Sequence, residues 1–263
     1  MSQLYDTIGV GYREQRRPDA RIGQAIGAAL GDAATVVNVG AGAGSYEPSD
    51  RPVVAVEIAR TMIDQRAPNA APAVQASGVG LPFADDSFEA SLAILTLHHW
   101  SDPAHGLREL ARVARRRLVL VTFDPEAKGF WLVSDYFPEI AENDRRSAPS
   151  LETLRHVLGD IDVRPLSVPH DCTDGFLGAF WRRPAAYLDP TVRGSISSFA
   201  KLSCVETGLD RLRADLDDGT WQRRFGHVLD LDEIDIGYRL VVAEYESQPE
   251  LLADEAEREE DAT

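Results

Sequence analysis

Short apolar runs alternate with amphipathic segments along most of the chain. The first of these runs is rich in β-branched residues, and the alternation predicts strands at residues 36–40, 53–57, 72–76, 90–95 and 117–123. Leu107, Leu110 and Ala114 then repeat at helical spacing, so a helix is expected near residues 102–114, with Ser101 or Asp102 as its N-cap. Such alternation predicts an α/β fold with a doubly wound, mostly parallel sheet.

Two further strands are expected near the end of the chain. One is predicted at residues 162–168, where the internal Pro165 cannot donate to a ladder and so indicates an edge or bulged strand. The other is predicted at residues 238–245, which gives a sheet of seven strands. The residues between these two strands carry aromatic-rich helical patterns at 175–188, 190–202, 209–216 and 221–229. We interpret residues 171–235 as a helical lid that shapes a substrate pocket and whose aromatic residues mostly form its own core.

The two ends of the chain differ in character from the predicted sheet. Residues 1–34 favour helix with a turn at Arg17-Pro18-Asp19, and we expect this segment to cover a site on the sheet. Residues 35–170 together with 236–246 would form the sheet domain. The strongly acidic residues 247–263 are expected to form a flexible tail.

The first strand leads directly into glycines at alternate positions, Gly40, Gly42 and Gly44. Glycines at a strand end allow a tight turn and a close approach of the backbone to a ligand. Glu57 closes the next apolar run, and a carboxylate at that point suits the two hydroxyls of a ribose. The first half of the chain is therefore expected to hold an adenosine-type cofactor.

The spacing of the glycines separates two classes of cofactor. A dinucleotide-binding loop needs a glycine where this chain has Ser45, whereas G-x-G-x-G resembles motif I of the class I S-adenosylmethionine (SAM)-dependent methyltransferases. Four later segments are similar to that family in the expected order, and the resemblance covers roughly residues 36–123; the segments are Val53 to Glu57, Leu81 to Glu89, Ile94 to Trp100 and Arg117 to Phe123. The resemblance implies a Rossmann-like sheet, SAM as cofactor and S-adenosylhomocysteine as product.

The resemblance also implies which residues surround SAM. Gly40, Ala41, Gly42 and Gly44 would lie under the methionine part, with Asn38 at the end of the preceding strand, and Glu57 would bind the ribose. Ile58 and Met62 would pack on the adenine, Ser77, Gly78 and Val79 would lie at its edge, and Leu95 and Thr96 would form the floor under the sulfonium. In the N-terminal segment, Tyr5 or Tyr12 would close the pocket and Arg17 would reach the carboxylate of SAM; simple packing of this segment on the sheet is the alternative.

His98 and His99 follow the fourth strand and are the candidate proton-transfer residues, because an imidazole titrates near neutral pH. The alternative is that the His-His-Trp run only packs and caps the following helix. His170 and Asp171 are candidates for lining the pocket rather than for a dyad, since adjacent residues in an extended chain point in opposite directions. Phe123-Asp124-Pro125 and Trp131 are expected to line the acceptor pocket.

Composition narrows the class of substrate. The chain carries 43 acidic against 27 basic side chains and a net charge of −16, which disfavours a nucleic-acid partner. It has no long apolar run and no signal-peptide pattern, so a membrane partner is not expected and the cytoplasm is the expected location. No Cys/His spacing indicates a metal. A small-molecule acceptor and a monomer or homodimer are expected.

The leading hypothesis is a SAM-dependent methyltransferase that acts on a small molecule by in-line displacement. Two alternatives use the same cofactor: an enzyme that exploits the sulfonium for a rearrangement or cyclisation, and a non-catalytic SAM-binding protein. A nicotinamide-dependent oxidoreductase is the least favoured reading.

Overall fold

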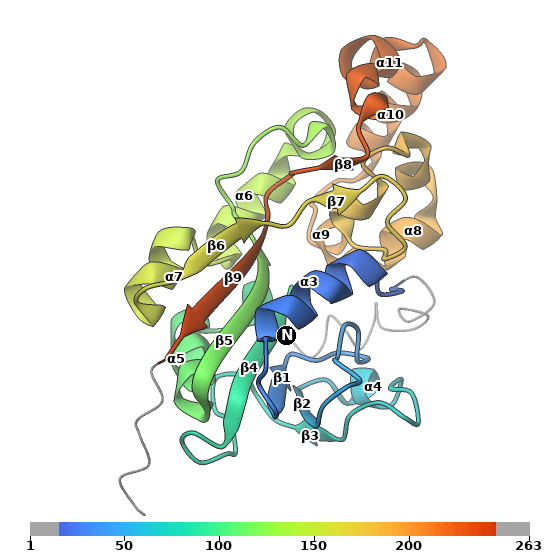
Figure 1. Cartoon of the computed structure of the whole chain (residues 1–263). Coiled ribbons are helices and arrows are strands. Elements are labelled where there is room, and N and C mark those ends of the chain that lie inside the picture. The colour runs from blue at the N-terminus through green and yellow to red at the C-terminus, as the bar shows by residue number, and fades with distance from the viewer. Residues whose placement is uncertain (1–15, 246–263) are drawn as a thin grey trace, which may run out of the picture.

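The computed structural model describes residues 16–245, which fold around a seven-stranded sheet of order β3-β2-β1-β4-β5-β9-β6 (Figure 1). β9 runs antiparallel to β5 and β6, and the other neighbouring strands are parallel. This confirms the mostly parallel α/β sheet. Its strands are β1 (Val36–Val39), β2 (Val53–Glu57), β3 (Ala73–Gln75), β4 (Phe88–Ile94), β5 (Ala114–Phe123), β6 (Asp162–Pro165) and β9 (Tyr238–Glu244).

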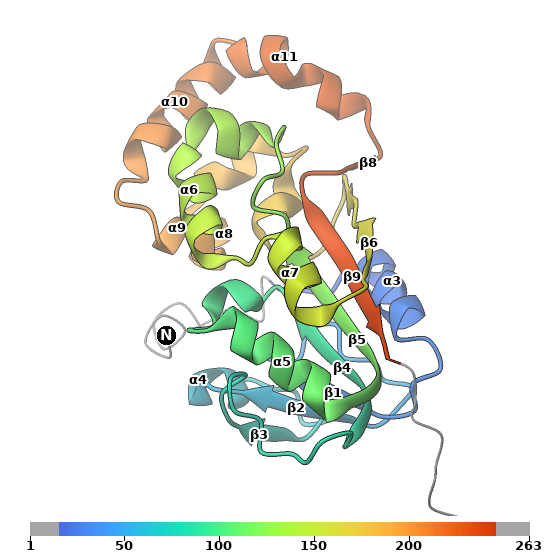
Figure 2. The same cartoon turned by 90° about the vertical axis from the view of Figure 1, so that its left-hand side faces the viewer.

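Helices cover both faces of the sheet, as Figures 1 and 2 show. α3 (Ala20–Leu30) packs on one face, while α5 (Pro103–Val113) and α7 (Leu151–Leu158) pack on the other. Successive strand residues serve opposite faces, so Val36 belongs to the core under α3 and Val37 to the core under α5. Asp102 caps α5 by accepting a hydrogen bond from the His105 N–H, as one of the two predicted N-caps. A short helix, α4 (Arg60–Ile63), follows β2.

The predicted strand at residues 162–168 is wrong in its second half. β6 ends at Pro165, which occupies the sheet edge because it has no N–H to donate. The chain then forms β7 (Val168–Pro169), which pairs with β8 (Glu233–Ile234) in a separate two-stranded sheet. β7 and β8 lie between the main sheet and the helices that follow β7 (Figure 1).

A group of helices lies above the carboxyl ends of the parallel strands, and we call it the cap (Figure 2). Helices are present at the expected places between β6 and β9. Those expected at 175–188 and 190–202 are divided into shorter ones, and Pro184 and Pro190 start new turns there. The helix expected at 209–216 extends over Glu206–Asp217, and Gly219, with a φ of 75°, separates it from the next one. Two helical elements of the cap precede β6 and were not expected. The cap comprises η2 (Leu132–Tyr136), α6 (Pro138–Ser147), η3 (Leu177–Phe180), η4 (Pro184–Leu188), α8 (Pro190–Gly194), α9 (Ser197–Ala200), α10 (Glu206–Asp217), α11 (Thr220–Phe225) and η5 (Gly226–Asp230).

Aromatic side chains form the core of the cap. Trp131 packs edge-to-face on Tyr187 and Trp221, and its indole N–H donates to the carbonyl of Trp181 at 2.9 Å. This core is continuous with the cluster under α3. The cap also includes residues 132–147, which the sequence analysis placed in the sheet domain. The domain boundaries drawn from the sequence remain a prediction. In the described range 16–245, every helix is too short or too polar to span a bilayer.

Candidate functional site

A cavity of about 700 Å³ lies between the carboxyl ends of the strands and the cap. Its lower wall comes from the segments after β1, β2, β3 and β4, and its upper wall from α6 and from residues 176–177 and 195–198. The volume is typical of a small-molecule site. Most residues singled out in the sequence line this one cavity, namely Asn38, Gly40, Ala41, Gly42, Glu57, Ile58, Met62, Ser77, Gly78, Val79, Leu95, Thr96, His98 and His99.

The glycine loop needs glycine for two separate reasons. Gly40, Gly42 and Gly44 have φ values of 70°, 53° and 96°, in the left-handed region that other residues avoid. A Cβ on Gly40 would also lie 2.7 Å from Cβ and 2.8 Å from Cγ2 of Thr96, and closer still to its Oγ1. The loop is tied to β2, because the N–H groups of Gly40 and Ala41 both donate to the carbonyl of Val56. Gly44 does not line the cavity, so its expected place under the ligand is not supported.

Glu57 is buried and its carboxylate organises the loop that precedes it in the chain. One oxygen accepts from the Gly42 N–H at 2.8 Å and the other from the Ala59 N–H at 2.8 Å. The side chain also lines the cavity, with 7% of its residue surface exposed. The carboxylate therefore shapes the glycine loop and faces the cavity at the same time.

A buried ion pair supports the loop from below. Arg66 donates to Glu47 at 2.6 Å and to the carbonyl of Gly42 at 3.1 Å. Asn38 donates to Glu47 at 3.2 Å through Nδ2, whereas its buried Oδ1 has no hydrogen-bond partner within residues 16–245. A buried amide oxygen at a cavity wall provides an acceptor for a ligand donor.

Trp100 fills a slot that two glycines create beside the cavity. A Cβ on Gly78 would lie 2.9 Å from the indole, and a Cβ on Gly106 would lie closer still. Gly78 therefore leaves room for Trp100, which also lines the cavity. The Ser77 hydroxyl accepts from the Val79 N–H at 3.3 Å and stabilises this turn.

His98 and His99 lie in the short helix η1 (Leu97–His99), and both line the cavity. Their ring centroids are 3.9 Å apart, and the His98 ring lies 5.3 Å from that of Phe123. Burial lowers the pKa of both imidazoles, and the cations Lys201 and Arg16 lower it further; the pKa of His99 falls to about 3. The expectation of a near-neutral pKa is therefore wrong, and both rings are neutral at pH 7.

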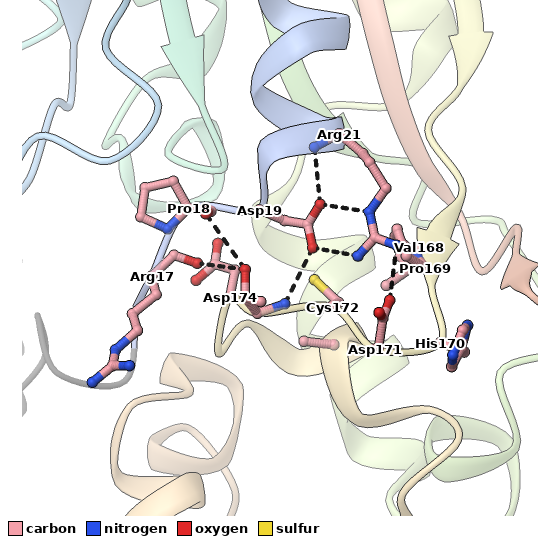
Figure 3. Close-up of polar contacts among 12 residues, drawn as sticks. Arg17, Pro18, Asp19, Arg21, Val168, Pro169, His170, Asp171, Cys172 and Asp174 are labelled. Carbon is pink, nitrogen blue, oxygen red and sulfur yellow. Dashed lines mark hydrogen bonds and ion pairs between the residues drawn. The ribbon is translucent and has the colours of Figure 1, made fainter.

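On the N-terminal side, Arg16 lines the cavity and Arg17 does not. Arg17 is exposed, and Figure 3 shows its side chain directed away from Asp19 and Asp174. Arg16 instead pairs with the buried Asp174, its Nε lying 2.6 Å from the carboxylate. Tyr5 and Tyr12 lie outside the described residues, so their predicted role is untested.

The cap side of the cavity combines apolar walls with acidic side chains, of which Asp144 is half-buried. Phe123, Asp124 and Pro125 line it as expected, but Trp131 belongs to the cap core, and the neighbouring Phe130 and Val133 line the cavity instead. Asp144 of α6 lines it too, and burial raises its pKa to about 6 although the charges of Lys201 and Arg145 oppose the shift. Sequence reasoning missed Asp144 because it assigned no helix to this segment.

His170 and Asp171 do not line the cavity. Asp171 forms an ion pair with Arg21 at 2.8 Å, and His170 Nδ1 lies 3.1 Å from the carbonyl oxygen of Asp232. Both residues therefore hold the segment after β7 in place, and the expectation that they line the pocket is wrong.

Comparison with known proteins assigns this site to a family. A solved structure from Anabaena variabilis, described as a methyltransferase of an antibiotic biosynthesis pathway, is 36% identical, covers 87% of this chain and 98% of its own, and has a TM-score of 0.79. The chain belongs to the SAM-dependent methyltransferases. Residues 37–121 match the family model described as a methyltransferase domain.

Two other relatives of this methyltransferase are more distant. A demethylmenaquinone methyltransferase from Corynebacterium kroppenstedtii is 34% identical over 84 residues, which are 30% of this chain and 37% of that enzyme. A SAM-dependent methyltransferase from Thermotoga maritima shares the fold at 15% identity, with a TM-score of 0.56 over 94% of this chain and 100% of its own.

The cavity of the methyltransferase fits the cofactor of its family. Gly40 and Gly42 line the cavity with backbone that carries no side chain, and the Asn38 Oδ1 offers an unused acceptor beside them. Within residues 16–245, no three His, Cys, Asp or Glu side chains are grouped so that they could bind a metal ion. A metal-free site stays a prediction.

Proposed function

We propose that this methyltransferase transfers the methyl group of SAM to a small-molecule acceptor that binds under the cap. One observation carries the proposal: a single cavity joins the glycine loop and Glu57 at one end to apolar residues of the cap at the other. An enclosed site of this kind can hold a cofactor and an acceptor side by side and exclude water from the reaction.

The residues that would hold SAM come from four strand ends. Gly40, Ala41 and Gly42 would support the methionine part, Glu57 would accept from the ribose hydroxyls, and Asn38 would accept a donor of the ligand through its buried Oδ1. Arg16, which lines the cavity whereas Arg17 does not, would bind the carboxylate. The remaining wall residues would contact the adenine and the sulfonium: Ile58, Met62, Ser77, Gly78, Val79, Leu95 and Thr96.

The acceptor half favours an organic molecule with an apolar or aromatic body. Its walls include Phe123, Phe130, Val133 and Phe176, which offer apolar surface and aromatic edges. The names of two relatives, an antibiotic-pathway methyltransferase and a demethylmenaquinone methyltransferase, support a small molecule as acceptor. The acidic chain gives no support to a nucleic-acid substrate.

Bound SAM supplies a methyl carbon on a positively charged sulfur, and the protein must align a nucleophile with it. His98 and His99 are neutral in the cavity and can orient an acceptor as hydrogen-bonding groups. A pKa of about 3 makes His99 a weak base, whereas the pKa of about 6 at Asp144 suits proton removal near neutral pH. Asp144 is therefore the stronger general-base candidate for an acceptor that must lose a proton.

Isothermal calorimetry with SAM and with S-adenosylhomocysteine tests the cofactor assignment. We expect both to bind with a stoichiometry of one per chain, and absence of binding to either would refute the proposal. Incubation with methyl-labelled SAM and a panel of phenolic, quinol and amine acceptors then tests methyl transfer. Labelled product together with equimolar S-adenosylhomocysteine would support it, whereas an acceptor converted without release of S-adenosylhomocysteine would indicate the non-methylating alternative.

A further inference from the structure

One buried carboxylate joins three distant parts of the chain beside the cavity. Asp174 lies after β7, and none of its side-chain surface is exposed. It accepts from Arg16 at 2.6 and 3.3 Å, from the Tyr46 hydroxyl at 2.9 Å and from the Gly175 N–H at 2.7 Å. A carboxylate with four donors around it is well compensated for its burial.

Both side chains that bind Asp174 also line the cavity. Tyr46 closely follows the glycine loop and has a φ of 62°, and its hydroxyl accepts from the Asp19 N–H at 3.2 Å. The charge of Arg16 lowers the pKa of His98 and His99, so the guanidinium lies within electrostatic range of the histidines in η1. Arg16 therefore faces the cavity between the glycine loop and η1.

A second, more exposed pair holds the same segment from outside. Asp19 caps α3, binds the Arg21 side chain and accepts from the Thr173 N–H at 3.2 Å, while Arg21 also reaches Asp171 (Figure 3). Asp171 is exposed and contributes to anchoring without touching the cavity. The two aspartates lie three residues apart. Asp174 contacts Arg16, which lines the cavity, whereas Asp171 is remote from the cavity.

We propose that Asp174 is a positioning residue that holds Arg16 as the binding group for the amino-acid carboxylate of SAM. This rests on the proposed function, because it assumes that SAM occupies the cavity with its methionine part on the glycine loop. A guanidinium has five N–H donors in a planar fork, so it can bind Asp174 on one edge and a second carboxylate on another. Asp174 fixes the orientation of that fork.

Two opposite effects decide what the loss of Asp174 would do. Removing its negative charge lowers the repulsion on an incoming carboxylate and, by Coulomb's law alone, would tighten SAM binding. Removing it also releases a long side chain with many rotamers, which would have to be fixed again on binding. Since Asp174 accepts two hydrogen bonds from Arg16, and 13% of the Arg16 side chain is exposed, we expect the loss of orientation to dominate.

The test measures binding of SAM and of decarboxylated SAM, which differ only in the carboxylate, by calorimetry on the full chain. In Asp174→Asn, SAM should bind about 10- to 100-fold more weakly while decarboxylated SAM binds as in the wild type. Arg16→Gln should show the same pattern, and the double variant should lose no more than either single variant. Asp171→Asn is the matched control and should leave both affinities unchanged.

The outcomes separate this inference from the proposed function. If the wild type bound neither compound, the proposed function would fail. If the wild type bound SAM but Asp174→Asn bound it equally or more tightly, only the positioning role would be refuted. A parallel loss for both compounds would show that Asp174 merely stabilises the fold, and would also refute the role. Should Asp174→Asn not fold, Arg16→Gln still decides the carboxylate contact, because Arg16 lies nearer the surface.

Discussion

Glu57→Gln perturbs the residue on which the cofactor site depends most. In the native protein the N–H groups of Gly42 and Ala59 each donate to a different carboxylate oxygen of Glu57, both at 2.8 Å. The substitution keeps the size of the side chain but replaces one of these two oxygens with an NH₂ group. One buried N–H would face an amide group and lose its acceptor, at a cost of about 1–3 kcal/mol in the free energy of unfolding. The glycine loop would shift with it.

The same change should weaken SAM binding beyond its effect on stability. The ribose hydroxyls would lose a charged acceptor, which is worth about 1.5–3 kcal/mol per hydrogen bond and predicts roughly 10- to 150-fold weaker affinity for S-adenosylhomocysteine. Calorimetry measures the affinity, and urea denaturation measures the free energy of unfolding.

Glu89→Gln is the matched control for Glu57→Gln. Glu89 also accepts from a backbone N–H, that of Ala34, but it does so at the start of β4, remote from the cavity. We expect this variant to lose stability and to keep its affinity. An unchanged affinity in folded Glu57→Gln, or an equal loss of affinity in Glu89→Gln, would refute the assignment.

Three further substitutions have defined outcomes. Gly40→Ala should abolish measurable S-adenosylhomocysteine binding by calorimetry, because the new Cβ meets Thr96 and the backbone has a positive φ. Gly106→Ala should lower the free energy of unfolding by about 1–3 kcal/mol in urea, because its Cβ displaces Trp100. Asp144→Asn should raise the free energy of unfolding at pH 8 by up to about 3 kcal/mol and leave it unchanged at pH 4. The pKa of Asp144 in the fold, about 6, lies above the usual aspartate value of about 3.9, so ionisation disfavours the fold as the pH rises from about 4 to 6.

Controls for these variants come from the same chain. Gly80→Ala and Gly27→Ala introduce a Cβ with no heavy atom within 4 Å, so neither should weaken the fold, and Gly27→Ala in α3 should stabilise it by about 0.5–1 kcal/mol. Normal ligand binding by Gly40→Ala would contradict the requirement for glycine beside Thr96. Wild-type stability of Gly106→Ala would contradict the tight packing of Gly106 on Trp100. For Asp144→Asn, a gain of equal size at pH 4 and pH 8 would show that packing, not charge, is responsible.

The lower half of the site was predictable because it depends on local sequence. Parallel strands place their carboxyl ends at one edge, so residues after β1, β2, β3 and β4 must meet there once the strands are identified. Glycines with positive φ and an acid at a strand end are features of a few consecutive residues. Of the predicted cofactor residues that the structure describes, Gly44 and Arg17 are the ones that do not line the cavity.

The upper half could not be read from the sequence. Neighbouring residues in an extended segment point in opposite directions, so the choice between Arg16 and Arg17 depends on where Asp174 lies, more than 150 residues away. The pKa values of the histidines likewise depend on burial and on the charges of Lys201, which follows α9, and of Arg16, which precedes α3.

Sequence by itself determined the sheet, the glycine loop and the carboxylate at the end of β2, because these follow from strand periodicity and from the conformational freedom of glycine. Tertiary structure decided that Arg16 lines the cavity and Arg17 does not, that Asp144 of α6 lines it, and which aromatic residues fill the cap core instead of the site. Those properties depend on contacts between segments far apart in the chain, and no local pattern encodes the direction in which a single side chain points.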